Sequence, residues 1–391
     1  MKLAIITTHP IQYNAPLFKL LNEQESLIVK VFYTWGVNVL NNKFDPGFNK
    51  TIEWDIPLLE GYDYTFSKNI ASVPGSHHFK GIDNPALIEE IESWQAEAVL
   101  VFGWSFKSHL NCIRYFHNKV PVYFRGDSTL TDATNFVKNF ARKFFLRWVY
   151  SFVNGAFYVG TENKHYYTEY GLKENQLFFA PHAVDNIRFN SYNTSLKKNQ
   201  TWRNDLGIAE DEMIFLYAGK LEPKKNIAFL VKCFYELNLR SAHLVIAGNG
   251  VLEESLKLLC REYPSIHFVD FQNQSQMPGV YDMADIFVLP SIGPGETWGL
   301  SVNEAMASGK AILVSSKAGC AIDLVKPGIN GFIFSPHNPG ELKQQLKMLN
   351  NKYKVAEMGD QSLVIINGWT LQKAVTEISS VLAKAKIKEL L

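Results

Sequence analysis

The sequence has 391 residues, of which 47% are hydrophobic, and its formal net charge at pH 7 is +1. This length can accommodate two ordinary domains with separate cores, and no apolar segment reaches the roughly 18 residues that span a bilayer. The near-neutral charge argues against a nucleic-acid binder, whose affinity depends on many phosphate contacts. The four cysteines lack the short spacing of a zinc or redox site, so we expect reduced thiols and a cytoplasmic protein.

Short apolar runs alternate with helical-length segments through the first half of the chain. They are LAIITT, LIVKVFYTW, AVLVFGW, VPVYFRGD, AFYVGT and LFFAPH. Such runs are typical of strands buried on both faces of a parallel sheet, and the first is expected to be a strand rather than part of a signal peptide. The pattern restarts with MIFLYAGK, HLVIAGNG, IHFVDF, DIFVLP, AILVSS and GFIFSP. We therefore predict an α/β protein with two doubly wound, Rossmann-like domains.

The domain boundaries are predicted from a change in composition. Residues 185–201 are rich in Asn, Ser and Lys and have little apolar periodicity, which is typical of a surface linker. We therefore predict a first domain at 1–184 and a second at 202–368. Residues 369–391 have a helical pattern and are predicted to form a C-terminal helix.

A basic aromatic segment at residues 135–152 interleaves aromatic side chains with Lys138, Arg142, Lys143 and Arg147. A helix of this composition can lie in a membrane interface. Because it precedes the strand AFYVGT, much of its apolar face is expected to pack on the sheet. We favour core packing, and weak contact with a membrane surface remains the alternative.

Positive charges follow the first strand of the second half. Lys220 comes directly after MIFLYAG, and Lys224 and Lys225 follow in the same loop. Ligands of open parallel sheets bind beyond the carboxyl ends of the strands. These lysines can bind an anion, although three lysines alone are also typical of a solvated turn. The turn at 248–250, Gly-Asn-Gly, is only a weak dinucleotide-binding signal, because Glu253 stands where that fingerprint has its third glycine.

The stretch GPGETWGLSVNEAMASGKAILVSS, Gly293 to Ser316, is the most specific in the chain. A glycine at the mouth of a helix lets the backbone approach a ligand, and the N–H groups of the first turn attract phosphate. Helical side chains lean toward the N-terminus, so Glu304 can reach the ligand that the loop residue Glu296 faces. The pattern offers amides for a diphosphate and carboxylates for sugar hydroxyls.

These two glutamates, eight positions apart around Thr297-Trp298-Gly299-Leu300, resemble the signature of family 4 glycosyltransferases, which are retaining enzymes of GT-B architecture. The family turn is Gly-aromatic-Gly-Leu, so one glycine and the usual phenylalanine are replaced here. Lys220 and Lys225 resemble the family's Gly-Arg followed five positions later by Lys, a pair that holds the donor diphosphate. Lysine at 220 keeps the positive charge and loses the bidentate fork of arginine.

The resemblance implies that Glu304 binds the ribose hydroxyls, Glu296 the transferred sugar, and residues 268–273 the nucleobase. The donor-binding residues that it implies are Gly219, Lys220, Lys225, Gly248, Asn249, Phe271, Gln272, Glu296, Thr297, Trp298, Gly299, Leu300 and Glu304. It also implies front-face displacement, in which the departing phosphate helps to deprotonate the acceptor, so no enzymic nucleophile is expected. The sequence contains no Asp-x-Asp, and we expect no metal and no cofactor.

The first half resembles the family less closely. Its opening, Thr8 to Tyr13, resembles a subgroup with Thr-His-Pro-Ile-Gln-Tyr; here His9 could orient an acceptor hydroxyl, although a histidine after a strand is more often hydrogen-bonded in place. Arg125 and Asp127 stand where many members have His-Gly. We expect Arg125 to contact an anionic group of the acceptor, and a structural ion pair is equally compatible. At the hinge, His182 is expected to cap the turn.

Together these features predict a GT-B fold in which two domains face each other across a cleft, with a C-terminal helix that crosses back toward the first domain. We expect a metal-independent, retaining glycosyltransferase that moves a sugar from a nucleotide sugar to a glycan, lipid-linked or other hydroxyl acceptor. The expected donor is a UDP-sugar. A role in bacterial-type surface polysaccharide or glycoconjugate synthesis is expected, at the inner face of the membrane. The alternatives are a non-catalytic sugar-nucleotide-binding subunit of a polysaccharide assembly complex and a GT-B phosphorylase or epimerase.

Overall fold

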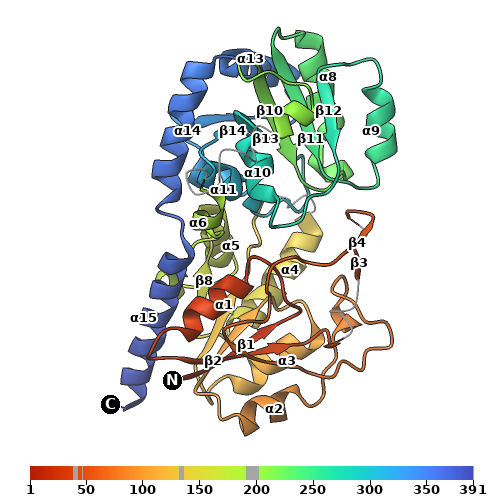
Figure 1. Cartoon of the computed structure of the whole chain (residues 1–391). Helices are drawn as coiled ribbons and strands as arrows, with labels where there is room; N and C mark the ends of the chain where they lie inside the picture. The colour runs from red at the N-terminus through yellow and green to blue at the C-terminus, as the bar shows by residue number, and fades with distance from the viewer. Residues whose placement is uncertain (38–42, 46, 132–135, 191–201, 391) are drawn as a thin grey trace. The chain divides into compact units, whose positions relative to one another are not determined.

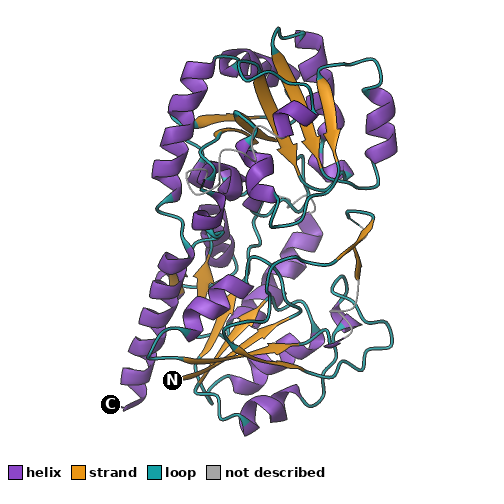
Figure 2. Cartoon of the chain, viewed as in Figure 1, coloured by secondary structure: helices purple, strands orange, loops and turns teal. Residues whose placement is uncertain are grey.

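The computed structural model describes residues 1–37, 43–45, 47–131, 136–190 and 202–390. The chain forms two compact units. The first unit is Met1–Lys43, Pro57–His182 and Leu371–Leu391, and the second is Phe44–Ile56 and Ala183–Thr370. Each unit is a parallel sheet with helices packed on it (Figures 1 and 2), which confirms the predicted pair of Rossmann-like α/β domains.

The units depart from the predicted boundaries in two places. The division falls between His182 and Ala183, and the start of the predicted linker is an ordered part of the second unit, while residues 191–201 lie outside the described residues. Asp185 caps the short helix α6 (Asn186–Phe189) by accepting a hydrogen bond from the Arg188 amide, and Phe189 is buried. The second departure is the Phe44–Ile56 segment, which was expected in the first domain.

The sheet of the first unit has seven parallel strands in the order β5-β2-β1-β6-β7-β8-β9. They are β1 (Lys2–Thr7), β2 (Ile28–Tyr33), β5 (Asp63–Phe66), β6 (Ala98–Phe102), β7 (Val122–Arg125), β8 (Gly155–Tyr158) and β9 (Leu177–Phe179). The helices are α1 (Ala15–Asn22), α2 (Leu87–Ser93), α3 (Lys107–Phe116), α4 (Phe136–Tyr150), α5 (Thr161–Glu169) and α15 (Leu371–Leu390), with 3₁₀ turns η2 (Phe79–Gly81) and η3 (Glu174–Gln176). Edge strand β5 was not predicted, because its sequence DYTF is not an apolar run.

Two cores cover the two faces of this sheet, because successive side chains of a strand point to opposite faces. Along β1, Leu3 and Ile5 belong to the core that includes residues of α1 and α15, whereas Ala4 and Ile6 belong to the core that includes residues of α2, α3 and α4. All four of these side chains are fully buried. A strand buried on both faces reads as a continuous apolar run, which is why the sequence predicted it.

The sheet of the second unit has six parallel strands in the order β12-β11-β10-β13-β14-β15. They are β10 (Met213–Ala218), β11 (Ala242–Ala247), β12 (Ile266–Val269), β13 (Ile286–Leu289), β14 (Ala311–Ser315) and β15 (Gly331–Phe334). Its further helices are η5 (Pro223–Lys225), α8 (Ile227–Leu237), α9 (Glu253–Leu259), α10 (Met277–Asp282), α11 (Leu300–Ala307), α12 (Ala321–Leu324), α13 (Pro339–Leu349) and α14 (Lys352–Ile366). The two-stranded sheet β3 (Lys43–Asp45) and β4 (Lys50–Ile52) lies in the Phe44–Ile56 region.

The chain order of this sheet reverses between β10 and β13. From β10 the chain proceeds outward to β11 and β12, and then returns to place β13 on the other side of β10. Ligands of open parallel sheets bind beyond the carboxyl ends of the strands at such a switch point. A ligand of the second unit is therefore expected beside the residues that follow β10 and β13.

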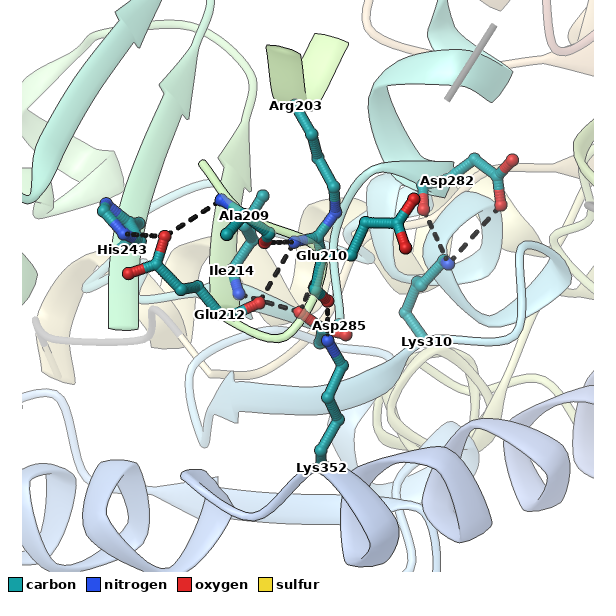
Figure 3. Close-up of polar contacts among 10 residues, drawn as sticks. All are labelled: Arg203, Ala209, Glu210, Glu212, Ile214, His243, Asp282, Asp285, Lys310 and Lys352. Atoms are coloured by element: carbon teal, nitrogen blue, oxygen red, sulfur yellow. Dashed lines mark hydrogen bonds and ion pairs between the residues drawn. The ribbon is translucent and has the colours of Figure 1, made fainter. Parts of the chain in front are cut away.

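The amino ends of the same strands carry a structural charge network (Figure 3). The Asp285 carboxylate, just before β13, accepts hydrogen bonds from Arg203 at 3.0 Å and from the Ile214 amide at 2.8 Å. Glu212 contacts His243 at 3.3 Å. These contacts fix the starts of neighbouring strands at the edge opposite the switch-point ligand edge, so we assign them a structural role.

Candidate functional site

Three glycines allow the turns after β10 and β11 to approach each other closely. A Cβ at Gly248 would lie 2.1 Å from the carbonyl oxygen of Gly219, and one at Gly250 would lie 2.6 Å from that of Leu221. Gly219, Gly248 and Gly250 also have positive φ. Close packing and backbone conformation therefore explain this glycine pattern, and direct ligand contact by Gly219 and Gly248 stays a prediction.

Asn249 connects the same turn to the loop after β12. Its side chain is buried; its oxygen accepts a hydrogen bond from the Phe271 amide at 2.7 Å, and its amide group donates to Glu253 at 2.7 Å and Asp270 at 3.1 Å. Asn249 is thus a positioning residue for the segment predicted to line the nucleobase. In that segment the Gln272 side chain donates back to the Asp270 carbonyl at 3.1 Å.

A buried ion pair joins the loops that follow β10 and β13. Lys225 Nζ donates to Glu296 Oε2 at 2.5 Å, and Ser291 Oγ donates to the same oxygen at 2.8 Å. The side chains of Lys225 and Glu296 are 15% and 8% exposed. Two residues 71 positions apart, both predicted as donor-site residues, therefore meet at the switch point. Ser291 is the neighbour that orients the carboxylate.

The environment of this pair keeps two nearby side chains neutral. Burial, assisted by the Glu296 charge, raises the pKa of Tyr217 and of Cys320 well above their ordinary values. The Tyr217 hydroxyl donates to the Lys220 carbonyl oxygen at 2.7 Å and so fixes that loop. A thiol with a raised pKa is a poor nucleophile, so Cys320 is no candidate for covalent catalysis.

The turn before α11 has the geometry of a glycine-dependent helix start. Gly299 is the N-cap residue with φ 101° and ψ 61°, and a Cβ there would lie 2.9 Å from Leu289 Cδ2. The same Cβ would be 3.7 Å from Glu296 Oε1, which places this carboxylate oxygen beside the helix start. Thr297 lies in the loop before Gly299, and Leu300 is the first residue of α11, as the sequence pattern implied.

Trp298 and Glu304 are held by neighbours in the second unit. The Trp298 side chain is 3% exposed, its indole donates to Asn303 at 2.8 Å, and its ring lies 5.3 Å from that of Trp369. The predicted contact of Trp298 with the donor is therefore expected through backbone atoms, because the side chain is buried. Glu304, on α11, is 3% exposed and accepts a hydrogen bond from the Tyr281 hydroxyl at 2.7 Å.

Lys220 does not join the Lys225–Glu296 pair. Its Nζ lies 2.9 and 3.0 Å from the two carboxylate oxygens of Asp45, within the Phe44–Ile56 segment. Lys224 contacts Glu222 at 3.8 Å. No local pattern in the sequence indicates Asp45, because this contact joins positions 175 residues apart.

In the first unit, Arg125 ends β7 with its guanidinium turned into the protein. Its Nη1 donates to the Ala180 carbonyl at 2.7 Å and its Nη2 to the Pro181 carbonyl at 3.1 Å, and the residue is 4% exposed. Burial lowers the pKa of Arg125 to about 10, so it remains protonated at pH 7. The guanidinium of Arg125 therefore has backbone partners where the structural alternative expected an ion pair, and its contact with an acceptor anion stays a prediction.

The other acceptor-side candidates also have protein partners. Asp127 lies 3.9 Å from His182 Nε2, and burial lowers the pKa of that histidine against the opposing effect of the carboxylate. His9 Nδ1 is 2.8 Å from the Thr8 hydroxyl, and its ring packs edge-on against Trp35 at 5.0 Å. The expectation that His9 orients an acceptor hydroxyl stays a prediction.

Helix α4 divides its apolar residues between two environments. Leu146, Val149 and Tyr150 are buried in the core of the first unit. Phe144 and Trp148 are 60% and 40% exposed. Core packing therefore accounts for only one face of the helix. Asn135 and the Lys138 side chain, which were part of the predicted basic aromatic segment, lie outside the described residues.

Two further observations concern membrane spans and metal ligands. None of the helices in the described ranges is long and apolar enough to cross a membrane. Among the same residues, no group of three or more His, Cys, Asp or Glu side chains is placed to hold a metal ion. Metal independence nevertheless remains a proposal, because this absence does not test the reaction.

Comparison with known proteins relates the second half of the chain to glycosyltransferases. Residues 198–362 match the family described as glycosyl transferases group 1. This part of the chain resembles a glycosyltransferase. An uncharacterized glycosyltransferase of Methanocaldococcus jannaschii is 32% identical over 154 residues, which cover 38% of this chain and 39% of that protein. A lipopolysaccharide 1,2-N-acetylglucosaminetransferase of Salmonella typhimurium is 35% identical over 142 residues, covering 33% and 37% of the two chains.

The matches to these two relatives span less than half of their length, whereas solved structures match the whole fold. A glycosyltransferase from Rickettsia africae has a TM-score of 0.75 at 15% identity over 98% of both chains. An Anabaena protein in complex with UDP has a TM-score of 0.73 at 16% identity, covering 98% of this chain and 100% of that one. These neighbours establish the GT-B type of fold.

Proposed function

We propose that the protein is a retaining glycosyltransferase that moves a sugar from a nucleotide sugar to a hydroxyl group without a metal ion. The observation that carries the proposal is the buried Lys225–Glu296 pair beside the start of α11. An ammonium group and a helix N-terminus can stabilise a diphosphate, and a carboxylate can accept hydrogen bonds from sugar hydroxyls. The Lys225–Glu296 pair and the start of α11 lie at the switch point of the second sheet, where ligands of open parallel sheets bind.

The pair has capacity left for a ligand. An ammonium group has three N–H donors and a carboxylate has about four lone-pair sites, so one mutual hydrogen bond leaves donors on Lys225 and acceptors on Glu296. Glu296 Oε1 faces the Gly299 turn, while Oε2 is held by Lys225 and Ser291. We assign Oε1 to the transferred sugar and the remaining N–H groups of Lys225 to the donor phosphate.

In this proposal the developing charge on the leaving diphosphate is met by fixed groups. Lys225 and the first-turn amides of α11 are held by the fold before the donor binds, which makes their stabilisation of the transition state effective. Glu304 is assigned to the ribose hydroxyls. The departing phosphate helps to deprotonate the acceptor, and no side chain is assigned as a nucleophile.

The donor is proposed to be UDP-linked and the acceptor a glycan or a lipid-linked sugar. The Anabaena structure was solved with UDP, and the Salmonella relative is named for lipopolysaccharide synthesis. A Campylobacter jejuni relative, 27% identical over 224 residues, is named for transfer to a diphospho-undecaprenol acceptor. These names support a role in polysaccharide synthesis, and we propose that the protein acts at the inner face of the membrane. A Corynebacterium glutamicum relative uses GDP-mannose, so the nucleobase needs a direct test.

The test is a thermal-shift screen with uridine, guanosine, adenosine and cytidine diphosphates and their common sugars, in buffer with EDTA. A ligand at 100 times its Kd adds about 2.7 kcal/mol to folded-state stability, so the matching nucleotide should raise the Tm by several degrees. The stabilising sugar nucleotide is then assayed for transfer to sugar-bearing lipid and glycan acceptors, and the product anomer is assigned by NMR. Inversion, or activity that requires magnesium or manganese, would contradict the proposed mechanism.

A non-catalytic sugar-nucleotide-binding subunit is the second candidate function. It is favoured by the engagement of Lys220 with Asp45, which removes one predicted phosphate ligand from the donor site. Nucleotide binding without turnover across the whole acceptor panel would support it. Cleavage of a glycosidic bond by inorganic phosphate with formation of a sugar 1-phosphate, or epimerised donor, would instead identify a GT-B phosphorylase or epimerase.

A further inference from the structure

The Phe44–Ile56 segment belongs to the second unit, and its residue Asp45 contacts Lys220, which was predicted to bind the donor phosphate. Both carboxylate oxygens of Asp45 lie within 3.0 Å of Lys220 Nζ. Asp45 Oδ1 also accepts hydrogen bonds from the amides of Gly47 and Phe48, at 2.8 and 3.2 Å. The carboxylate is therefore oriented by its own turn toward the lysine.

The same turn covers the Lys220 side chain. A Cβ at Gly47 would lie 2.6 Å from Lys220 Cδ and 2.7 Å from its Nζ, so the backbone at Gly47 packs directly against the lysine. The Phe48 ring centroid is 5.0 Å from Lys220 Nζ, a cation–π distance. Burial raises the pKa of Asp45, but the hydrogen bond and charge of Lys220, together with the amides of Phe48 and Gly47, outweigh this effect and hold the pKa below its ordinary value.

The segment continues along the loop that was predicted to line the nucleobase. Phe48 packs edge-on against Phe271 at 4.8 Å between ring centroids. Asn273 donates to the Glu53 carbonyl at 2.6 Å, and the Ser275 amide donates to Asp55 Oδ1 at 3.1 Å. One segment thus contacts both places where the ends of a nucleoside diphosphate are expected, and all of these contacts lie within the second unit.

We propose that the Phe44–Ile56 segment is an intramolecular competitor for the donor site, in which the Asp45 carboxylate takes the place of a donor phosphate on Lys220 and a nucleoside diphosphate binds by displacing it. The inference rests on the proposed function. A phosphate brought to Lys220 would meet the Asp45 carboxylate at close range, and like charges repel. The opposite role, in which Asp45 holds Lys220 in place for the phosphate, predicts the opposite effect on affinity.

The test compares the wild-type chain with Asp45→Asn by calorimetric titration with UDP and with inorganic pyrophosphate, which carries no base. Removing the competing charge should lower the Kd about twofold to fivefold for both ligands, the range for an ion pair whose side chains are 33% and 30% exposed. The matched control is Asp360→Asn, which removes the same charge from an exposed position on α14. Its Kd should equal that of the wild type.

A second measurement follows the segment itself. Peptide-level hydrogen exchange should show faster exchange of the peptide that spans residues 47–56 when UDP is added to the wild-type protein, because displacement of the segment breaks the hydrogen bond from the Asp55 amide to Asn273 Oδ1. Unchanged or weaker ligand affinity in Asp45→Asn would overturn the inference, while measurable UDP binding would leave the proposed function standing. If neither protein binds any nucleoside diphosphate or pyrophosphate, the proposed function fails and the competition fails with it.

Discussion

Glu296→Gln should reveal that one carboxylate has a structural and a chemical role. The substitution keeps the shape of the side chain and leaves Lys225, which is 15% exposed, without its charged partner. Breaking a buried ion pair by removing one member typically costs about 3–5 kcal/mol, and the residual exposure here places the expectation at about 3 kcal/mol. For a domain of this size that loss lowers the Tm by roughly 6–12 °C.

A second substitution separates the two roles. Lys225→Met in the Glu296→Gln background removes the buried uncompensated charge, so most of the lost stability should return. Sugar transfer should not return, because both the proposed sugar ligand and the proposed phosphate ligand are then absent. Stability is measured by urea unfolding at pH 7, and transfer is measured well below the lowered Tm, so that every variant is folded during the assay.

Two results would refute this reasoning. Transfer at the wild-type rate by folded Glu296→Gln would remove Glu296 from the donor site. A double variant less stable than Glu296→Gln alone would show that Lys225 stabilises the loop by contacts other than the ion pair. Glu357→Gln, at an exposed position on α14, is the matched control and should change neither quantity.

Three further outcomes are expected. Glu304→Gln should raise the Kd for the matching nucleotide about tenfold in calorimetry, as for a lost hydrogen bond to a charged group, and an unchanged Kd would contradict the ribose assignment. Burial lowers the pKa of His109 from 6.5 to about 4. Its stabilising contribution is therefore complete above about pH 6.5 and is lost as the pH falls toward 4, by about 3 kcal/mol in urea unfolding, and His109→Gln should flatten this slope. Anionic vesicles should bind the chain weakly and release it in salt, and Phe144→Ser with Trp148→Ser should reduce flotation; tight, salt-resistant binding would show that the aromatic face of α4, and not its charge, dominates the association.

The sequence predicted the parts of the fold that depend on local residue patterns, such as apolar runs and a glycine at a helix start. Runs such as MIFLYA and AILVS are buried on both faces of a parallel sheet, so their continuous hydrophobicity identified the strands. Gly299 was identified as a helix start, and the structure shows why glycine is needed there: φ is positive and Leu289 is too close for a Cβ. The Glu296 and Glu304 positions followed from the same local pattern.

Contacts between distant segments could not be predicted in this way. Nothing in the residues around Asp45 indicates that they pack on the second unit, because the contact depends on a fold that brings residues 175 positions apart together. Arg125 was predicted as a ligand from its position after a strand, and its two carbonyl partners at 180 and 181 became visible only in the structure. For the same reason the sequence could not show which face of α4 is buried.

The lysine at position 220 and the carboxylate at position 45 are best understood together. The resembling family has arginine at this position, and an arginine would hold Asp45 by two parallel hydrogen bonds in a fixed plane. An ammonium group is a compact point charge with rotatable donors, so it can exchange one anion for another with less geometric cost. If the Phe44–Ile56 segment competes with the donor, lysine leaves that competitor easier to displace. When the motif is considered alone, the loss of the arginine fork weakens the resemblance to the family. It is consistent with a donor site in which the Asp45 carboxylate occupies Lys220 and exchanges with the donor phosphate.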